Sequence, residues 1–563
     1  MRRVRWLALG LFLLLLMGCG EKGSANGQAP PRGRAPSATP ARMRVPNPTA
    51  TATPWAALPP TPVRSPTPTF TPTPAVHTWA LGPGVPEAVA QAAAVADPRW
   101  TRAPAAEDAD VVWTWATEPD QPVAARWRYV LVAPFFTLDQ GASLAQVRAF
   151  WQGDADALPP AGLRATPETI AALTAFWGPP SPATVHPTAP AALIPQAWAA
   201  DHWALVPFDA LEPRWKALDL DGHAPWDASY PLDLPLTVVV RRPLGDLTPP
   251  GPQGNFSPDH LTTVALTGVT ALVRATAYTM EVKGLTYPAE DIGPLLAGAD
   301  ITHISNEIPF DPDCPPPNPS QKGLKFCSDP RYIALLEAVG TDVVELTGDH
   351  FNDRGPEAVY YTVNMYRERG WQYYGGGENL DDARRPALFE HNGNRLAFVG
   401  CNAKGGGYAR AAADYPGAAA CDWDFLTAQV QELRQQGYLP IVTFQHYEYY
   451  VFDPPESMKA DFRRMAEAGA VIVSGSQAHH PHGMAFYQGA LLTYGLGNLF
   501  FDQKGTTPYG DQAFIALHYF YGNRHISTRL VPIRFVDFAK PVRMTPDEAR
   551  PLLEAVFAVS EGP

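Results

Sequence analysis

The feature that most constrains the fold is an alternation of short apolar runs and helical patterns between residues 260 and 538. The apolar runs are rich in β-branched residues, which is typical of buried strands. Strands that alternate with helices indicate a mostly parallel sheet covered by helices. We expect strands at 263–266, 300–305, 342–346, 395–399, 440–444, 471–473 and 491–494, and helices at 356–369, 422–436 and 455–468.

Polar side chains follow five of these predicted strands. Because the carboxyl ends of parallel strands meet at one edge of a sheet, we expect these side chains to lie close together. Carboxylates, imidazoles and an amide are ligands for a divalent metal. A simpler interpretation also exists for each loop, for example a helix cap or a solvated surface. The loops supply Asn306, Glu307, Asp349, His350, Asp353, Gln445, His446, Glu448, His479, His480, His482 and Asn498.

Residues 1–19 have the layout of an export signal, with three arginines before an apolar run over 6–17. That run is too short for a membrane-spanning helix. Leu16-Met17-Gly18-Cys19 resembles a bacterial lipobox. The resemblance implies that Cys19 is lipidated and holds the exported protein on the outer face of a cell membrane. The alternative is a cleaved signal with an incidental cysteine.

Residues 20–75 consist mainly of Pro, Thr, Ala, Ser and Gly, so we expect an extended stalk without a core. Residues 76–246 predict a separate α/β domain, with strands at 111–114 and 129–133 and a helix at 144–151 capped by Ser143. The sequence around that helix is similar to phosphate-type periplasmic solute-binding domains, and an ordinary α/β domain without a ligand is the alternative. Residues 247–259 predict a linker and 539–563 a C-terminal tail.

The net charge limits the classes of partner, and the cysteines indicate which bonds to expect in an oxidising compartment. The net charge is −13 and no basic domain offsets it, which argues against nucleic acid as a partner. Beyond Cys19, four cysteines form two close pairs, and in an oxidising compartment we expect Cys314 to pair with Cys327 and Cys401 with Cys421. Zinc binding is the alternative, although neither pair has Cys-x-x-Cys spacing.

Four motifs occur in order along the second domain: Gly348-Asp-His-Phe-Asn-Asp-Arg-Gly355, Gly375-Gly-Gly-Glu-Asn-Leu-Asp-Asp-Ala-Arg-Arg-Pro386, His480-Pro481-His482 and Gly495-Leu-Gly-Asn-Leu499. They resemble motifs of the CapA family, the poly-γ-glutamate capsule synthesis proteins. The resemblance implies a calcineurin-like metallophosphoesterase fold over 260–538, which is a four-layer α/β sandwich.

The resemblance also implies a function in the biosynthesis of poly-γ-glutamate capsule or another cell-envelope polymer. The implied partners are an anionic polymer or a small-molecule ligand, together with other capsule-synthesis proteins. If the protein is an enzyme, a metal-bound water would attack a phosphoester or an amide. The implied metal ligands are Glu307, Asp349, His350, His480 and His482, and the implied catalytic residues are His350, Asp353, His446 and Asn498.

Two departures from the family pattern leave catalysis open. The family strand that ends in Gly-Asp corresponds to 264–272 here, which contains no acid. The family His-Trp-Gly-x-Glu loop corresponds to 445–448, so its histidine is either replaced by Gln445 or shifted to His446. A two-metal centre needs a bridging carboxylate and a full ligand set, so we expect at most one ion of Mn, Zn or Fe. The alternative function is a non-catalytic ligand-binding or scaffold lipoprotein with a degenerate fold.

Overall fold

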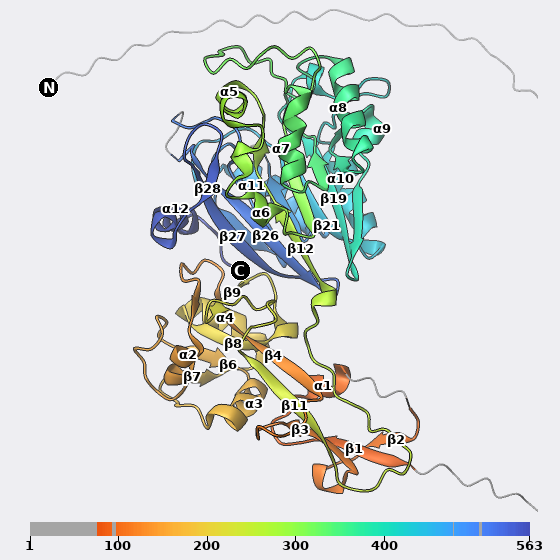
Figure 1. Ribbon diagram of the computed structural model, residues 1–563, viewed down its shortest axis with the longest axis vertical. Helices are drawn as coiled ribbons and strands as arrows, with labels where there is room; N and C mark the ends of the chain where they lie inside the picture. The colour runs from red at the N-terminus through yellow and green to blue at the C-terminus, as the bar shows by residue number, and fades with distance from the viewer. Residues whose placement is uncertain (1–75, 93–96, 477, 506–508) are drawn as a thin grey trace, which may run out of the picture. The chain divides into compact units, whose positions relative to one another are not determined.

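The computed structural model describes residues 76–92, 97–476, 478–505 and 509–563, which form two α/β domains (Figure 1). The predicted export signal, lipobox and stalk lie outside the described residues. Among the helices that are described, none has both the length and the apolar character needed to span a bilayer.

The first domain is built on one mixed sheet. Its strands are β1 (His77–Leu81), β2 (Trp100–Arg102), β3 (Val111–Trp115), β4 (Ala125–Pro134), β6 (Leu163–Ala165), β7 (Val185–Pro187), β8 (Trp203–Pro207), β9 (Trp215–Ala217) and β11 (Asp233–Val240). Their order is β2-β1-β3-β11-β4-β8-β6-β7, and β9 pairs with β4. Two short strands, β5 (Gly141–Ala142) and β10 (Asp219–Leu220), pair separately.

The predicted elements of this domain are confirmed. The strands expected at 111–114 and 129–133 lie within β3 and β4. The expected helix is α2 (Leu144–Trp151), where Ser143 and Gln146 form a capping box that satisfies free N–H groups of the first turn. The other helices are α1 (Glu87–Ala92), α3 (Pro167–Trp177) and α4 (Pro190–Ala200).

The second domain contains two large sheets. The strands of the first sheet are β12 (Leu261–Leu266), β13 (Val269–Thr270), β14 (Ile301–Asn306), β15 (Val343–Glu345), β16 (Gln372–Tyr374), β25 (Asn498–Phe500), β26 (Gln512–Tyr521), β27 (His525–Phe535) and β28 (Pro541–Arg543). They follow the order β16-β15-β14-β12-β26-β27-β28, with β13 beside β14 and β25. In Figure 1, β12, β26 and β27 run side by side.

The second sheet contains β18 (Ala387–His391), β19 (Asn394–Asn402), β21 (Leu439–Gln445), β22 (Ile472–Gly475), β23 (Met484–Tyr487) and β24 (Ala490–Thr493). Its order is β18-β19-β21-β22-β24-β23. The pairs β19–β21, β21–β22 and β22–β24 are parallel, as are β12–β14, β14–β15 and β15–β16 of the first sheet. The seven strands that the apolar runs predict are all among these, so the expected parallel arrangement is confirmed. A further pair, β17 (Gly376–Gly377) and β20 (Gly417–Ala418), is separate.

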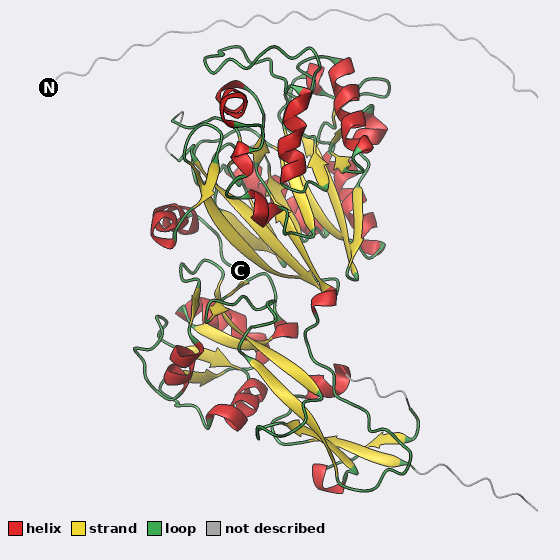
Figure 2. Cartoon of the chain, viewed as in Figure 1, coloured by secondary structure: helices red, strands yellow, loops and turns green. Residues whose placement is uncertain are grey.

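Helices cover the outer face of each sheet and complete four layers (Figure 2). The first sheet packs against α5 (Arg274–Lys283), α6 (Gly293–Leu296), α7 (Ile333–Ala338) and α8 (Pro356–Glu368), and the second against α10 (Trp423–Gln435) and α11 (Glu456–Ala468). Between the sheets lies an apolar core that includes Val264, Ile301, Val343, Phe398, Ile441 and Ile472. The predicted four-layer sandwich is confirmed. A short helix, α9 (Leu380–Ala383), lies between β17 and β18 in the sequence.

Residues 539–563 differ from the expected tail, because they contain β28 and α12 (Pro546–Ala558). β28 extends the first sheet by pairing with β27. α12 starts at a capping box formed by Thr545 and Glu548, and it buries Leu552 and Val556 in the core between the sheets. The spacing Thr-x-x-Glu before an apolar run is a helix-start signal, so this element was legible in the sequence.

Both predicted disulfides are present. Cys314 bonds to Cys327 in the segment between β14 and α7, and Cys401 near the end of β19 bonds to Cys421 just before α10. Each disulfide therefore fixes a loop that starts at the carboxyl end of a strand.

Candidate metal site

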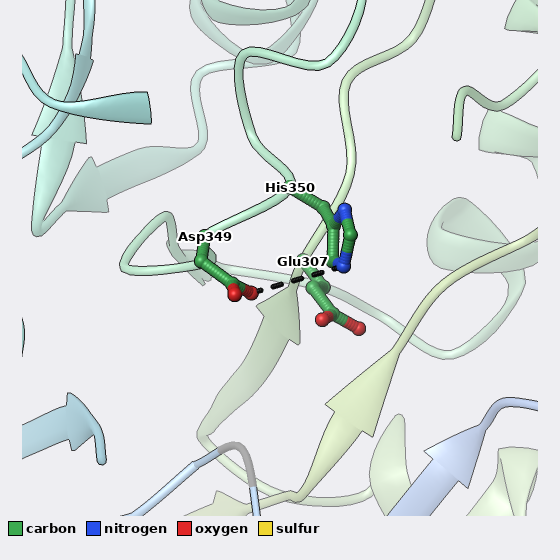
Figure 3. A group of neighbouring side chains, drawn as sticks. All are labelled: Glu307, Asp349 and His350. Carbon is green, nitrogen blue, oxygen red and sulfur yellow. Dashed lines mark ion pairs between the residues drawn. The ribbon is translucent and has the colours of Figure 1, made fainter. Parts of the chain in front are cut away.

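Three predicted ligands meet at the carboxyl edge of the first sheet. Glu307 directly follows β14, and Asp349 and His350 lie on the loop after β15. Their candidate ligand atoms all lie within 4.8 Å of one another. Figure 3 shows the Asp349 carboxylate paired with the His350 ring and Glu307 beside them. Gly348 permits this approach, because a Cβ at that position would clash with the backbone of Glu307.

The His350 ring is held by Asp353, another of the implied catalytic residues. His350 Nδ1 lies 2.7 Å from Asp353 Oδ2, and the same oxygen accepts the Phe326 N–H at 2.8 Å. Because an ionised carboxylate only accepts hydrogen bonds, Nδ1 carries the proton and Nε2 faces Asp349, with Oδ1 at 4.0 Å. Burial alone would lower the pKa of His350, but Asp353, Glu307 and Asp349 outweigh it and raise the pKa to about 9.

Glu307 is a buried acid whose ion pair, among the described residues, is a long one with His479. Its side chain is 3% exposed, and His479 Nε2 lies 4.0 Å from Oε1. Burial raises the pKa of Glu307, and the positive charges of His479 and His350 only partly oppose this effect. A divalent cation at the cluster would stabilise the ionised form of this carboxylate.

His479 approaches the cluster from the loop after β22 of the second sheet. Its Nδ1 lies 2.8 Å from Asn498 Oδ1, and Asn498 Nδ2 donates to the His479 carbonyl oxygen at 3.4 Å. The Asn498 oxygen therefore accepts the Nδ1 proton and leaves Nε2 directed at Glu307. His479 has φ of +52°, a conformation that costs a non-glycine residue about 1 kcal/mol or more and that is concentrated at functional sites.

His480 and His482, the expected ligands of this loop, lie outside the cluster of Glu307, Asp349 and His350. His480 Nδ1 lies 2.7 Å from the Pro481 carbonyl oxygen, and its ring packs against Phe452 at 4.9 Å. His482 is fully buried, and burial lowers its pKa to about 3. The loop therefore brings His479 to Glu307 in place of these two residues.

The side chains of the loop after β21 bear on whether the family histidine is replaced by Gln445 or shifted to His446. Gln445 ends β21, and its Nε2 donates to Asp349 Oδ1 at 2.7 Å. His446 turns away from the cluster, and its Nε2 lies 3.0 Å from Asp461 Oδ2. Of these two residues, Gln445 is therefore the one whose side chain contacts the cluster, and His446 is not among the described residues that form it.

Lys404 adds a positive charge that the sequence interpretation missed, and it pairs with the predicted strand-end residue Glu448. Lys404 Nζ lies 3.2 Å from Asp349 Oδ2 and forms an ion pair with Glu448. Glu448 also accepts a hydrogen bond from the Tyr450 hydroxyl at 2.7 Å. Lys404 lies on the loop after β19, far along the chain from Asp349, and no motif connects the two.

At the end of β12, where the family pattern has an aspartate, the residues of this chain are packed against neighbouring backbone and apolar side chains. Thr267 donates to the His303 carbonyl oxygen at 2.7 Å, and Gly268 packs so closely on the Gly497 carbonyl that a side chain would clash. The next residue, Val269, is fully buried among apolar side chains. This strand end therefore contributes packing and no ligand.

Aromatic rings form an apolar wall behind both candidate imidazole ligands. Phe326 lies 4.8 Å from the His350 ring and Phe501 lies 5.1 Å from the His479 ring. The Arg274 guanidinium contacts both phenyl rings, at 5.3 and 4.7 Å. Such a wall lowers the local dielectric, which strengthens charge–charge interactions in the cluster.

The donor set fits a single divalent ion. Glu307 and Asp349 offer carboxylate oxygens, and His350 and His479 offer imidazole nitrogens whose Nδ1 atoms already have partners. Mixed oxygen and nitrogen donors suit manganese, zinc or iron.

A four-layer sandwich with this cluster at its strand ends defines a protein with the calcineurin-like metallophosphoesterase fold. Residues 263–503 match the family model described as "Bacterial capsule synthesis protein PGA_cap". The second domain belongs to this family, the CapA family.

Relatives in capsule synthesis agree with this assignment. The chain is 26% identical over 288 residues to the capsule biosynthesis protein CapA of Bacillus anthracis, covering 50% of this chain and 69% of that protein. It is 26% identical over 204 residues to the PGA biosynthesis protein CapA of Bacillus subtilis (strain 168), covering 35% of this chain and 52% of that protein. The chain thus spans about half of the second relative's length.

Solved structures overlap with the chain only in part. A 5'-nucleotidase precursor from Thermus thermophilus matches 52% of this chain and 59% of its own at 14% identity, with a TM-score of 0.31. An ABC-type phosphate transport receptor from Vibrio cholerae matches 30% of this chain and 88% of its own at 10% identity, with a TM-score of 0.25. Scores this low describe partial overlap, so the fold assignment rests on the strand order and the family match.

Proposed function

We propose that this protein acts in the biosynthesis of poly-γ-glutamate capsule or of another anionic envelope polymer, through a metal-dependent hydrolase-type site. The observation that carries the proposal is the cluster of Glu307, Asp349 and His350, whose ligand atoms lie within 4.8 Å of one another. The names of the two Bacillus relatives support the biological context.

Each residue of the cluster has a defined task in this proposal. A bound divalent ion supplies a polarised water at neutral pH. Glu307 and Asp349 hold the ion's charge from two adjacent strand ends. Asp353 and Asn498 retain the Nδ1 protons of His350 and His479, so both rings present Nε2 to the site. Asp353 and Asn498 are therefore positioning residues.

A second candidate function is a non-catalytic protein that binds an anionic polymer or a small molecule as a scaffold. The absence of an acid at the end of β12 favours it, since Thr267, Gly268 and Val269 supply no ligand there. Both the hydrolase and the scaffold are expected to bind a metal ion, and only the hydrolase is expected to turn over a substrate.

Turnover with and without metal separates them. We expect the purified chain to hydrolyse bis(p-nitrophenyl) phosphate or to shorten poly-γ-glutamate after loading with Mn²⁺ or Zn²⁺, and to lose this activity with a chelator. Asp349→Asn should lower turnover by at least about 100-fold, because it removes a charged ligand. Glu554→Gln, an exposed change on α12, is the matched control. Metal binding without turnover on either substrate would select the scaffold function.

We also propose that the protein is exported and held at the outer face of a membrane through lipidated Cys19, where it works with other capsule-synthesis proteins. The lipobox-like segment 16–19 and the Pro/Thr-rich segment 20–75 support this placement. We further propose that the protein binds an anionic polymer or a small-molecule ligand, and the net charge of −13 argues against nucleic acid as a partner.

A further inference from the structure

On the basis of the proposed metal site, we propose that the Lys404 ammonium fills the second cation position of this centre, so that the centre holds one divalent ion and one ammonium on opposite sides of Asp349. Two-metal centres place a carboxylate between their ions. In this chain Asp349 has that bridging position, with a candidate ion site on one side and Lys404 on the other.

The two oxygens of Asp349 have different neighbours. Oδ1 lies 4.0 Å from His350 Nε2 and belongs to the side of the ligand cluster. Oδ2 lies 3.2 Å from Lys404 Nζ. The carboxylate therefore separates the candidate metal ligands from a fixed positive charge.

Lys404 is held in place by its surroundings. Glu448 forms the second ion pair of the ammonium, and the Tyr450 hydroxyl fixes the other oxygen of Glu448. The Lys404 side chain is only 24% exposed. An ammonium that contacts two carboxylates in a partly buried site imitates the contacts of a bound cation.

The loop that carries Lys404 is anchored beside the cluster. Asn402 donates to the Thr347 carbonyl oxygen and to Gln445 Oε1, both at 2.6 Å, and Gln445 in turn donates to Asp349. The disulfide of Cys401 immediately precedes Asn402. Lys404 thus starts from a backbone that is tied to the same strand ends as the candidate ligands.

The charges balance for one ion and not for two. Glu307, Asp349 and Glu448 contribute three negative charges around the two cation positions. One divalent ion and one ammonium contribute three positive charges. A second divalent ion beside the ammonium would bring five positive charges against these three negative ones, so the ammonium excludes that ion for as long as it is present.

The test is the number of Mn²⁺ ions bound by the full chain and by Lys404→Met, measured by equilibrium dialysis. We expect one ion in the wild type and two in Lys404→Met, with the spin-coupled EPR signal of a carboxylate-bridged manganese pair in the variant only. Lys459→Met is the matched control, because Lys459 also pairs with two carboxylates, Asp453 and Glu561, outside the cluster. That control should bind one ion.

Lys404→Arg keeps a positive charge and should bind one ion, which separates the effect of charge from a folding defect in Lys404→Met. One ion in the wild type and in a folded Lys404→Met, with the six-line EPR signal of isolated manganese in both, would overturn the role of Lys404 and leave the metal site standing. Two ions in the wild type would also overturn it. No ion in either protein would overturn the proposed metal site, and the role of Lys404 with it.

Discussion

At the scale of single residues, the site depends on which nitrogen of each imidazole faces the carboxylates. His350 and His479 come from different sheets, yet each has Nδ1 bound to a neighbouring oxygen, of Asp353 and Asn498 respectively. A histidine whose Nδ1 proton is held presents Nε2 in a fixed direction and is a stronger ligand. The pairing with Asp353 and Asn498 therefore prepares both rings for a metal.

Asp353→Asn tests this arrangement. The amide can present its N–H to His350 Nδ1 and favour the wrong tautomer, so we expect Mn²⁺ or Zn²⁺ affinity to fall about 10- to 100-fold. Calorimetric titration of the folded variant measures the change. Asp381→Asn, a change at an exposed acid on α9, is the control. Equal affinities in Asp353→Asn and the wild type would mean that Asp353 has only a structural role.

The sequence predicted which side chains lie close together where those residues directly follow neighbouring parallel strands. Glu307, Asp349 and His350 follow adjacent parallel strands, and they meet in the structure. The choice among three histidines within four residues could not be made in advance, because it depends on the left-handed backbone of His479. The role of Lys404 could not be predicted, because its partner Asp349 is distant in the sequence and no motif joins the two residues.

At the scale of elements, the hairpin β26–β27 contains a buried polar cluster next to the sheet core. His518 Nδ1 and His525 Nε2 both contact Thr528 Oγ1, at 2.8 and 2.9 Å. Burial lowers the pKa of His525 from 6.5 to about 3, although its bond to the Ser527 carbonyl oxygen opposes this. The neutral ring is therefore the form that the fold requires.

The lowered pKa of His525 predicts acid sensitivity. Between pH 6.5 and about 3 the unfolded chain binds a proton at this residue that the folded chain does not, so the free energy of unfolding falls as the pH falls. His525→Gln should reduce the pH slope of the free energy of unfolding by up to about 1.4 kcal/mol per pH unit. Above pH 6.5 the slope should be the same in the variant and the wild type. Urea unfolding from about pH 4 to 7 measures it. His391→Gln, at a ring that is 40% exposed, is the control and should keep the wild-type slope.

Strands that alternate with helices could be predicted from the sequence. Strands that pair antiparallel at the side of the sheet were harder to predict. The strands β12, β14, β15, β19, β21, β22 and β24 match the apolar runs, because both faces of a central parallel strand are buried. β26 and β27 are long and pair antiparallel, so they break the alternation that guided the sequence interpretation. α12 was missed although its capping box is visible in the sequence.

At the scale of the whole molecule, the chain joins a predicted membrane anchor, a stalk and two α/β domains. The anchor and stalk lie outside the described residues and stay predictions. Cys19→Ser should shift the protein from the membrane fraction to the soluble fraction, because the lipid-accepting thiol is lost. Fractionation with Cys314→Ser as the control distinguishes loss of the anchor from loss of folding. Unchanged membrane association of Cys19→Ser would contradict the lipobox interpretation.

The central claim is that Glu307, Asp349, His350 and His479 hold one divalent ion. The most direct measurement is an anomalous difference map from crystals grown with Mn²⁺ or Zn²⁺. We predict a single peak with bonds of about 2.0–2.2 Å to the carboxylate oxygens and to Nε2 of both histidines. A peak at His480 and His482, or no peak among these four residues in a well-ordered crystal, would contradict the claim.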